Sequence, residues 1–164
     1  MNIKNIVFNF NSMSHFLMAF TTLSVYKFSS RVKNIYIFGH ILISLAQYYI
    51  KYDIDKYKYL SSGLGMVGHS FLALFMYCVL KTNLNFMNIG FLISQGFMIL
   101  FYINNSISDI NIIKKIIFNI VLSFLSLFYV ISTFTINNVS KYAYILVAIV
   151  YLNLVLYMDL IGQA

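Results

Sequence analysis

The sequence predicts an all-α membrane protein, a polytopic transmembrane bundle of about six helices with short loops. Of its 164 residues, 61% are apolar and 9% are charged, whereas soluble domains have about 45–50% apolar and about 25% charged residues. It contains no proline that would break a helix. Its charged residues separate apolar runs of about 20 residues, the length that crosses a bilayer core of about 30 Å.

The apolar runs define one integral membrane domain, over residues 1–164, with no visible linker. The connections between the runs are short, so successive helices are expected to be antiparallel neighbours. Lysines flank the runs and account for the net charge of +7, which is therefore not a sign of nucleic-acid binding. A charged loop is expected at residues 51–58. The predicted spans are residues 6–27, 34–50, 60–80, 86–103, 116–136 and 142–162.

Nearly every predicted span carries one line of polar side chains, because residues four and seven apart share a helix face. An unpaired amide or imidazole facing lipid costs several kcal/mol, so these lines are expected to face the bundle interior. There they form either interhelical contacts or a polar pocket. The lines are Asn11, His15 and Thr22; His40, Ser44 and Gln47; Ser61, Gly65 and Gly68 beside His69; Asn88 and Gln95; Asn119, Ser123 and Ser126; Asn153 and Tyr157.

The histidines are the best candidates for chemistry, because ionisable side chains at membrane depth are candidates for function. His40 and His69 lie within spans, whereas His15 lies nearer a span end and is expected at the interface. Asp159 is the one acid inside a predicted span, and its place near the C-terminus also favours the interface. With Cys78 as the single cysteine, no disulfide is expected, and neither a metal nor a cofactor is predicted.

Two segments resemble the YhhN-like lysoplasmalogenase family of polytopic membrane proteins. They are residues 37–47 (IFGHILISLAQ) and, after the charged loop, residues 60–77 (LSSGLGMVGHSFLALFMY). In that family a helix ending in Gly-Asp precedes a glycine-rich helix carrying Gly-His, which Gly68 and His69 match. Residues 20–23 (FTTL) resemble the end of the family's Lys-Pro-Leu-Thr-Thr-Leu segment. Residues 151–156 fall where the family has Ser-Asp followed by apolar residues.

The chain departs from the family at its acidic positions. Ala46 and Gln47 stand in place of Gly-Asp, and Leu152 and Asn153 stand in place of Ser-Asp. The family is expected to have eight spans, two more than this chain. The resemblance implies hydrolysis of the vinyl-ether bond of lysoplasmalogens, which gives a free aldehyde and a glycerophospho-headgroup. A membrane lipid or lysophospholipid is then the partner.

The candidate site follows from the resemblance and the polar lines together. The amides of Gln47 and Asn153 can hydrogen-bond a substrate but cannot carry a proton at neutral pH. Either histidines perform the acid–base steps or the chain is a non-catalytic relative. The missing carboxylates favour weak or absent catalysis. The alternative functions are a non-enzymatic membrane subunit or scaffold and, third, a small transporter or channel. The candidate catalytic residues are His69, Gln47 and Asn153, and the candidate substrate-binding residues are His40, Ser44, Gly65, Gly68 and Tyr157.

Overall fold

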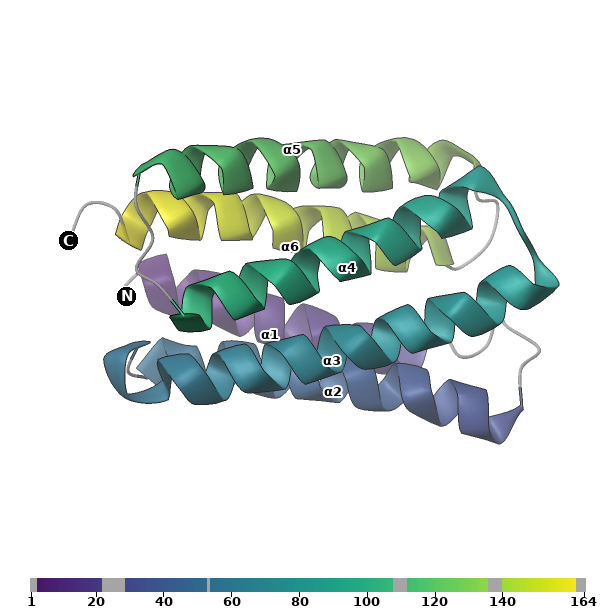
Figure 1. The fold of residues 1–164 in the computed structure, drawn as a ribbon, viewed down its shortest axis with the longest axis horizontal. Coiled ribbons are helices and arrows are strands. Elements are labelled where there is room, and N and C mark those ends of the chain that lie inside the picture. The colour runs from purple at the N-terminus through teal and green to yellow at the C-terminus, as the bar shows by residue number, and fades with distance from the viewer. Residues whose placement is uncertain (1–2, 22–28, 53, 108–111, 136–139, 162–164) are drawn as a thin grey trace.

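The described part of the chain is built from six helices and contains no strand, which confirms the predicted all-α class. The computed structural model describes residues 3–21, 29–52, 54–107, 112–135 and 140–161. The helices lie side by side with their axes roughly aligned (Figure 1). They are α1 (Ile3–Thr21), α2 (Ser30–Tyr52), α3 (Ile54–Thr82), α4 (Phe86–Ile107), α5 (Ile112–Thr135) and α6 (Ser140–Ile161).

The helices form a four-helix unit and a hairpin. In the four-helix unit, α1 packs on α2, α2 on α3 and α3 on α4, while α5 and α6 form the hairpin and α6 also packs on α1. These pairs agree with the expectation that successive helices are neighbours. The exception is α4 and α5, which are successive but make few backbone contacts. Aromatic rings fill the space between them, such as Phe101 and Phe118, with ring centroids 5.0 Å apart.

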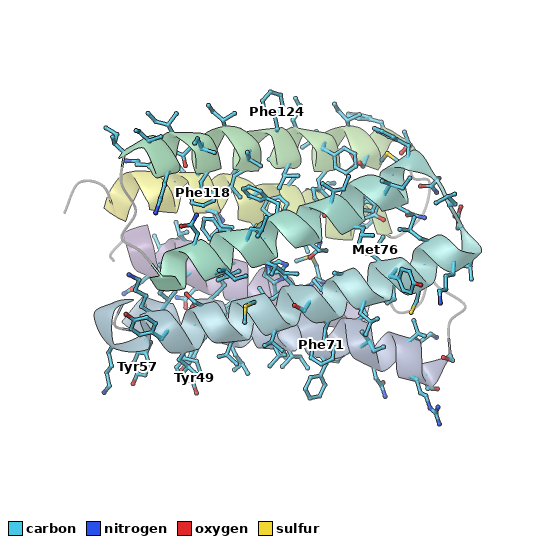
Figure 2. The ribbon with its side chains drawn as sticks, in the orientation of Figure 1. Tyr49, Tyr57, Phe71, Met76, Phe118 and Phe124 are labelled. Atoms are coloured by element: carbon cyan, nitrogen blue, oxygen red, sulfur yellow. The ribbon has the colours of Figure 1, made fainter. Side chains whose placement is uncertain are left out.

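Apolar side chains cover most of the outside of the bundle, and many polar side chains are buried within it. Ser123 is an exception, because it was expected to face the interior and is exposed. On α5, Phe124 is 68% exposed and points away from the other helices (Figure 2), whereas Ser126 and Ser132 are buried. Soluble monomers rarely expose apolar patches of more than a few hundred Å². The arrangement is therefore typical of a protein surrounded by lipid, as the composition predicts.

Three helices of the described chain are long and apolar enough to cross a membrane. They are Lys56–Thr82, Phe86–Asn104 and Ile112–Thr135, and the apolar stretch Tyr144–Leu156 of α6 is shorter. α3 has 29 residues and, at 1.5 Å per residue, is about 43 Å long. That is more than the length needed to cross the hydrocarbon core of about 30 Å.

The predicted charged loop at residues 51–58 is wrong in its extent. α2 continues to Tyr52 and α3 already begins at Ile54, so most of this segment is helical. It contains no glycine or proline, and lysine is a good helix former. Charge marks the end of the apolar stretch, whereas the helix itself continues past that point.

Two glycines bring α2 and α3 into close contact. A Cβ atom on Gly68 would lie 2.8 Å from the carbonyl oxygen of Gly39, and one on Gly39 would lie 2.9 Å from that of Gly68. The two backbones therefore touch at a point where a side chain would force them apart. Small residues of this kind are how membrane helices pack closely. Each glycine directly precedes a histidine, and this contact therefore sets His40 and His69 at the same level of the bundle.

Candidate functional site

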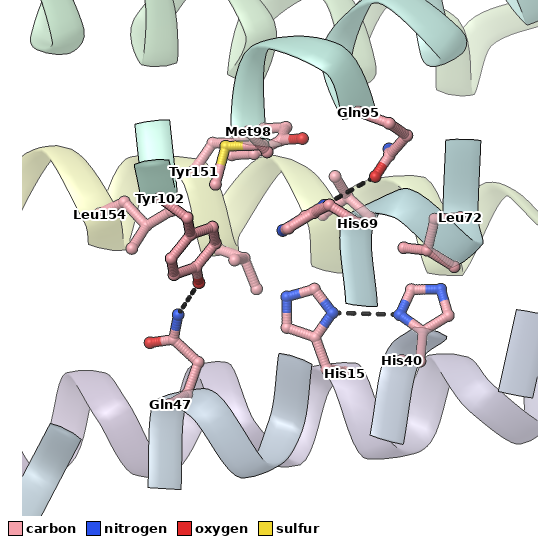
Figure 3. A pocket seen from close by; sticks show the side chains of 12 residues that line it. His15, His40, Gln47, His69, Leu72, Gln95, Met98, Tyr102, Tyr151 and Leu154 are labelled. Carbon is pink, nitrogen blue, oxygen red and sulfur yellow. Dashed lines mark hydrogen bonds between the residues drawn. The ribbon is translucent and has the colours of Figure 1, made fainter. Parts of the chain in front are cut away.

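Three histidines from three helices meet inside the bundle (Figure 3). His15 of α1, His40 of α2 and His69 of α3 are all buried. The Nδ1 atoms of His15 and His40 lie 3.1 Å apart, within hydrogen-bond distance. The ring of His69 stands at 89° to that of His15, with centroids 6.4 Å apart. When both rings of the His15–His40 pair are neutral, one Nδ1 donates and the other accepts.

A glutamine on α4 determines which nitrogen of His69 carries the proton. The amide oxygen Oε1 of Gln95 lies 2.8 Å from Nδ1 of His69. An amide oxygen only accepts, so Nδ1 of His69 is the donor and Nε2 of the neutral ring keeps a free electron pair. The amide of Gln95 is oriented in turn by its bond from Nε2 to Oγ of Ser94. In Figure 3 the second ring nitrogen of His69 points away from Gln95, toward the side of Tyr102.

A second polar pair faces the histidines across the same space. Nε2 of Gln47 donates to the hydroxyl oxygen of Tyr102 at 2.9 Å, and the Tyr102 ring lies 5.6 Å from that of His69. The ring packs directly against Gly65, where any Cβ atom would collide with it. Oε1 of Gln47 is buried and has no hydrogen-bond partner among the described residues. This oxygen is one of three buried side-chain atoms in the described residues that lack a hydrogen bond.

These groups surround a small cavity of about 30 Å³. A cavity needs about 10–15 Å³ to admit one water molecule, and a water needs two to four polar partners. The cavity has room for one water molecule, and imidazole, amide and phenol side chains are among the groups that line it. The polar side chains that line it are His15, His40, Gln47, His69, Gln95, Tyr102 and Tyr151.

The predicted site residues divide between this cavity and other places. His69, Gln47 and His40 line it. Asn153 does not, because its Nδ2 donates to Oδ1 of Asn11 at 3.0 Å. Oγ of Ser44 instead bonds Ser12, donating to its carbonyl oxygen at 2.8 Å.

The remaining candidate substrate-binding residues support the packing around the site. Gly65 supports the Tyr102 ring, and Gly68 packs against α2. Neither glycine lines the cavity. The side chain of Tyr157, like that of Asp159, lies outside the described residues.

The structure adds residues that sequence reasoning did not assign to the site. His15 is buried beside His40 and lines the cavity, because α1 runs beside α2 at the level of His40. Gln95 belongs to a predicted polar line, so a signal for it existed. Tyr102 is one of 14 tyrosines, and no pattern in the sequence distinguishes it from the others.

The centre has few of the features of a metal site. Nδ1 of His15 bonds His40, and Nδ1 of His69 bonds Gln95, so these three nitrogens do not face a common point. Within the described ranges, no group of three or more histidine, cysteine or acidic side chains has a geometry that could hold a metal ion. The arrangement instead offers neutral donors and acceptors around room for one water molecule, which suits proton transfer.

The comparisons with known proteins return no relative for this chain: no protein family, no curated protein and no solved structure matches it.

Proposed function

We propose that all six helices cross the bilayer and that the protein is a multi-pass integral membrane protein. α1, the shortest helix, has 19 residues and is about 28 Å long at 1.5 Å per residue, close to the bilayer core. α1 and α2 carry many of the buried polar residues, which lowers their mean hydropathy although their outer faces are apolar. Phe16, for example, is 52% exposed and Phe38 is 58% exposed.

Site-specific labelling tests the six-span topology. Single cysteines are placed at Asn2, before α1, and at Ser29, between α1 and α2, in a Cys78→Ser background, and intact vesicles are treated with a membrane-impermeant thiol reagent. Six spans place the two positions on opposite sides, so only one is labelled before the vesicles are opened. Labelling of both positions in intact vesicles, with a buried control at Ala148 unlabelled, would contradict this topology.

We further propose that the histidine centre hydrolyses the vinyl-ether bond of a lysoplasmalogen. The observation that supports this most is the convergence of His69 and Gln47, with His15 and His40, around space for one water molecule. Vinyl-ether hydrolysis needs a proton donor for carbon and a base for water, and two imidazoles can supply both. The centre thus offers an acid–base route that does not need the family's missing carboxylates.

The proposed reaction begins with proton transfer to the substrate. The His15–His40 pair, which is neutral at rest, takes up one proton from solvent and donates it to the second carbon of the vinyl ether, and the first carbon becomes an oxocarbenium ion. Nε2 of His69 removes a proton from water as its oxygen bonds that first carbon, giving a hemiacetal. The hemiacetal loses the glycerol oxygen, which leaves as an alcohol with the proton from His69. The hemiacetal hydroxyl returns a proton to the His15–His40 pair as the aldehyde forms.

Aldehyde release from purified protein tests the enzymatic proposal. The protein in detergent is given lysoplasmenylethanolamine, and fatty aldehyde is measured. His69→Asn is expected to lower the rate by about 10²–10⁴, the usual contribution of a general base. The matched control is Ser70→Ala, because Ser70 is the exposed neighbour of His69 and bonds only the carbonyl of Met66 within its own helix. Equal rates for His69→Asn and the wild type would contradict the proposal.

A structural role is the second candidate, and the pairing of polar groups favours it. Besides the contacts at the cavity, Oγ of Ser61 donates to the carbonyl of Ala46 at 2.8 Å, and Oγ of Ser126 donates to that of Ala148 at 3.0 Å. These bonds join neighbouring helices in the way expected of a scaffold. A double variant, His69→Leu with Gln95→Leu, separates the two roles when both stability and activity are measured. Replacing both partners by apolar side chains leaves no unpaired polar group, so a purely structural pair can be replaced with little loss of stability. The unchanged stability of a fully inactive double variant would support catalysis.

A further inference from the structure

A second cavity adjoins the first, and most of the side chains that line it are aromatic or aliphatic. Its volume is about 70 Å³. Relative to the histidines, this cavity lies closer to the N-terminal ends of α2 and α6. The rings and side chains that line it include Tyr36, Phe75, Met76, Phe91 and Tyr144.

The two cavities share one wall. His40, Leu72, Gln95 and Val147 line both of them. The imidazole of His40 and the amide of Gln95 therefore border both cavities, and the second cavity extends from them to aromatic rings and methionine side chains. A ligand that occupies both cavities contacts polar groups at this wall and aromatic rings beyond it.

We propose that the second cavity binds the first carbons of the substrate's hydrocarbon chain, next to the reacting bond. This inference rests on the proposed vinyl-ether hydrolysis and specifies the direction in which the substrate lies. The ether oxygen faces His69 and Gln47, and the chain runs from there past Val147 toward Phe91 and Tyr144. The glycerophospho-headgroup then lies on the opposite side, toward Gln47 and the ends where α2 and α4 finish.

The size of the cavity defines how much of the chain it holds. An engineered cavity of about 150 Å³ binds one benzene, so about 70 Å³ accommodates only a few carbon atoms. The rest of the chain leaves through the aromatic seam between α4 and α6, where the rings of Phe91 and Tyr144 lie 4.5 Å apart. Side chains, and not close backbone contact, separate the helices there, and the two rings touch, so they must turn apart for a lipid chain to pass into the bilayer.

Photolabelling in the membrane tests this chain-binding cavity without requiring turnover. The probe is a lysophosphoethanolamine with a saturated ether chain, which vinyl-ether chemistry does not cleave, and with a diazirine at the fourth chain carbon. After irradiation of the full-length protein in vesicles, mass spectrometry locates the adducts. Adducts on Met76, Phe91 or Tyr144 are expected. Adducts confined to outward residues such as Phe124 and Phe134, or no adducts at all, would overturn the proposal.

A cavity-filling pair of variants supplies the matched control. Val147→Phe fills the shared wall and is expected to reduce cavity labelling at least tenfold, whereas Val130→Phe makes the same change on the exposed face of α5 and leaves labelling unchanged. If Val147→Phe fails to fold, Leu72→Phe at the same wall replaces it. Cavity labelling without aldehyde release would retain the binding site and reject the hydrolase. Aldehyde release without cavity labelling would reject the binding site alone.

Discussion

At the residue scale, a neutral side chain sets the tautomer and orientation of the His69 ring. Histidine bases are commonly oriented by a carboxylate, as in the Ser-His-Asp triad. In this chain Oε1 of Gln95 takes that place at 2.8 Å from Nδ1. The amide fixes the tautomer without adding charge, and no side chain lining the cavity is an acid, lysine or arginine. A site that lacks fixed charges avoids the cost of burying one in a bilayer.

Replacing Gln95 therefore tests a positioning role. Gln95→Leu removes the acceptor for Nδ1, so His69 loses the constraint on its tautomer and orientation. Aldehyde release should fall at least tenfold, whereas Gln95→Glu keeps an acceptor oxygen and should recover part of the rate. The ¹⁵N chemical shifts of the His69 ring report the tautomer directly. A Gln95→Leu protein with wild-type shifts and rate would show that Gln95 does not position His69.

At the element scale, the contact between α2 and α3 determines where the histidines meet. Gly39 and Gly68 allow the backbones to touch, and the next residue on each helix is a site histidine. The other glycines of α3 differ in their surroundings. A Cβ on Gly63 would meet nothing within 4 Å. The glycines of α3 therefore have separate roles, although they form one cluster in the sequence.

The stability of glycine variants tests this distinction. Gly68→Ala places a methyl group against the Gly39 carbonyl and should destabilise the protein by about 1–3 kcal/mol, as overpacking does. Gly63→Ala, the matched control, should be neutral or stabilise the helix by up to about 1 kcal/mol. Thermal unfolding in detergent, followed by circular dichroism, gives both values. A Gly68→Ala protein as stable as Gly63→Ala would contradict the close contact.

The outer face of α5 provides a test of the membrane environment. Phe124 lies near the middle of α5 and is 68% exposed, and Ile112 at its start is 74% exposed. Lysine at the centre of a membrane helix costs about 2.5–3.5 kcal/mol, and near an end it reaches the interface. Phe124→Lys should therefore reduce membrane insertion strongly and Ile112→Lys only slightly, as measured by alkaline extraction of membranes. Equal insertion of both variants would show that this face is not in lipid.

At the scale of the whole molecule, the sequence predicts the helices better than it predicts the site. Apolar runs and charges located all six helices, because their lengths follow from the bilayer that composition indicates. Periodicity also indicated which residues turn inward, including His40, Gln47 and His69. It could not predict which lines meet, since that depends on how helices pack in three dimensions. For this reason Asn153 bonds Asn11 instead of reaching the cavity, and His15 and Tyr102 were not assigned to it.

The bundle is divided into a four-helix unit and a hairpin, and the boundary between these two units forms a seam inside it. The histidines belong to α1, α2 and α3, whereas Val147 and Tyr151, on the opposite wall of the polar cavity, belong to α6. Both cavities therefore lie between the two units, where aromatic rings separate the backbones. Polar chemistry and an apolar chain can meet in this seam without a charged residue in the bilayer.

The central claim is that the histidine centre protonates a vinyl ether. Hydrolysis in deuterated water tests this claim most directly. Proton transfer to the second carbon predicts that wild-type protein releases fatty aldehyde carrying one deuterium at that carbon. It also predicts that His69→Asn releases aldehyde at least 100-fold more slowly while Ser70→Ala does not. Mass spectrometry of the aldehyde gives both results. Folded wild-type protein that releases no aldehyde, or releases it without deuterium, would contradict the account.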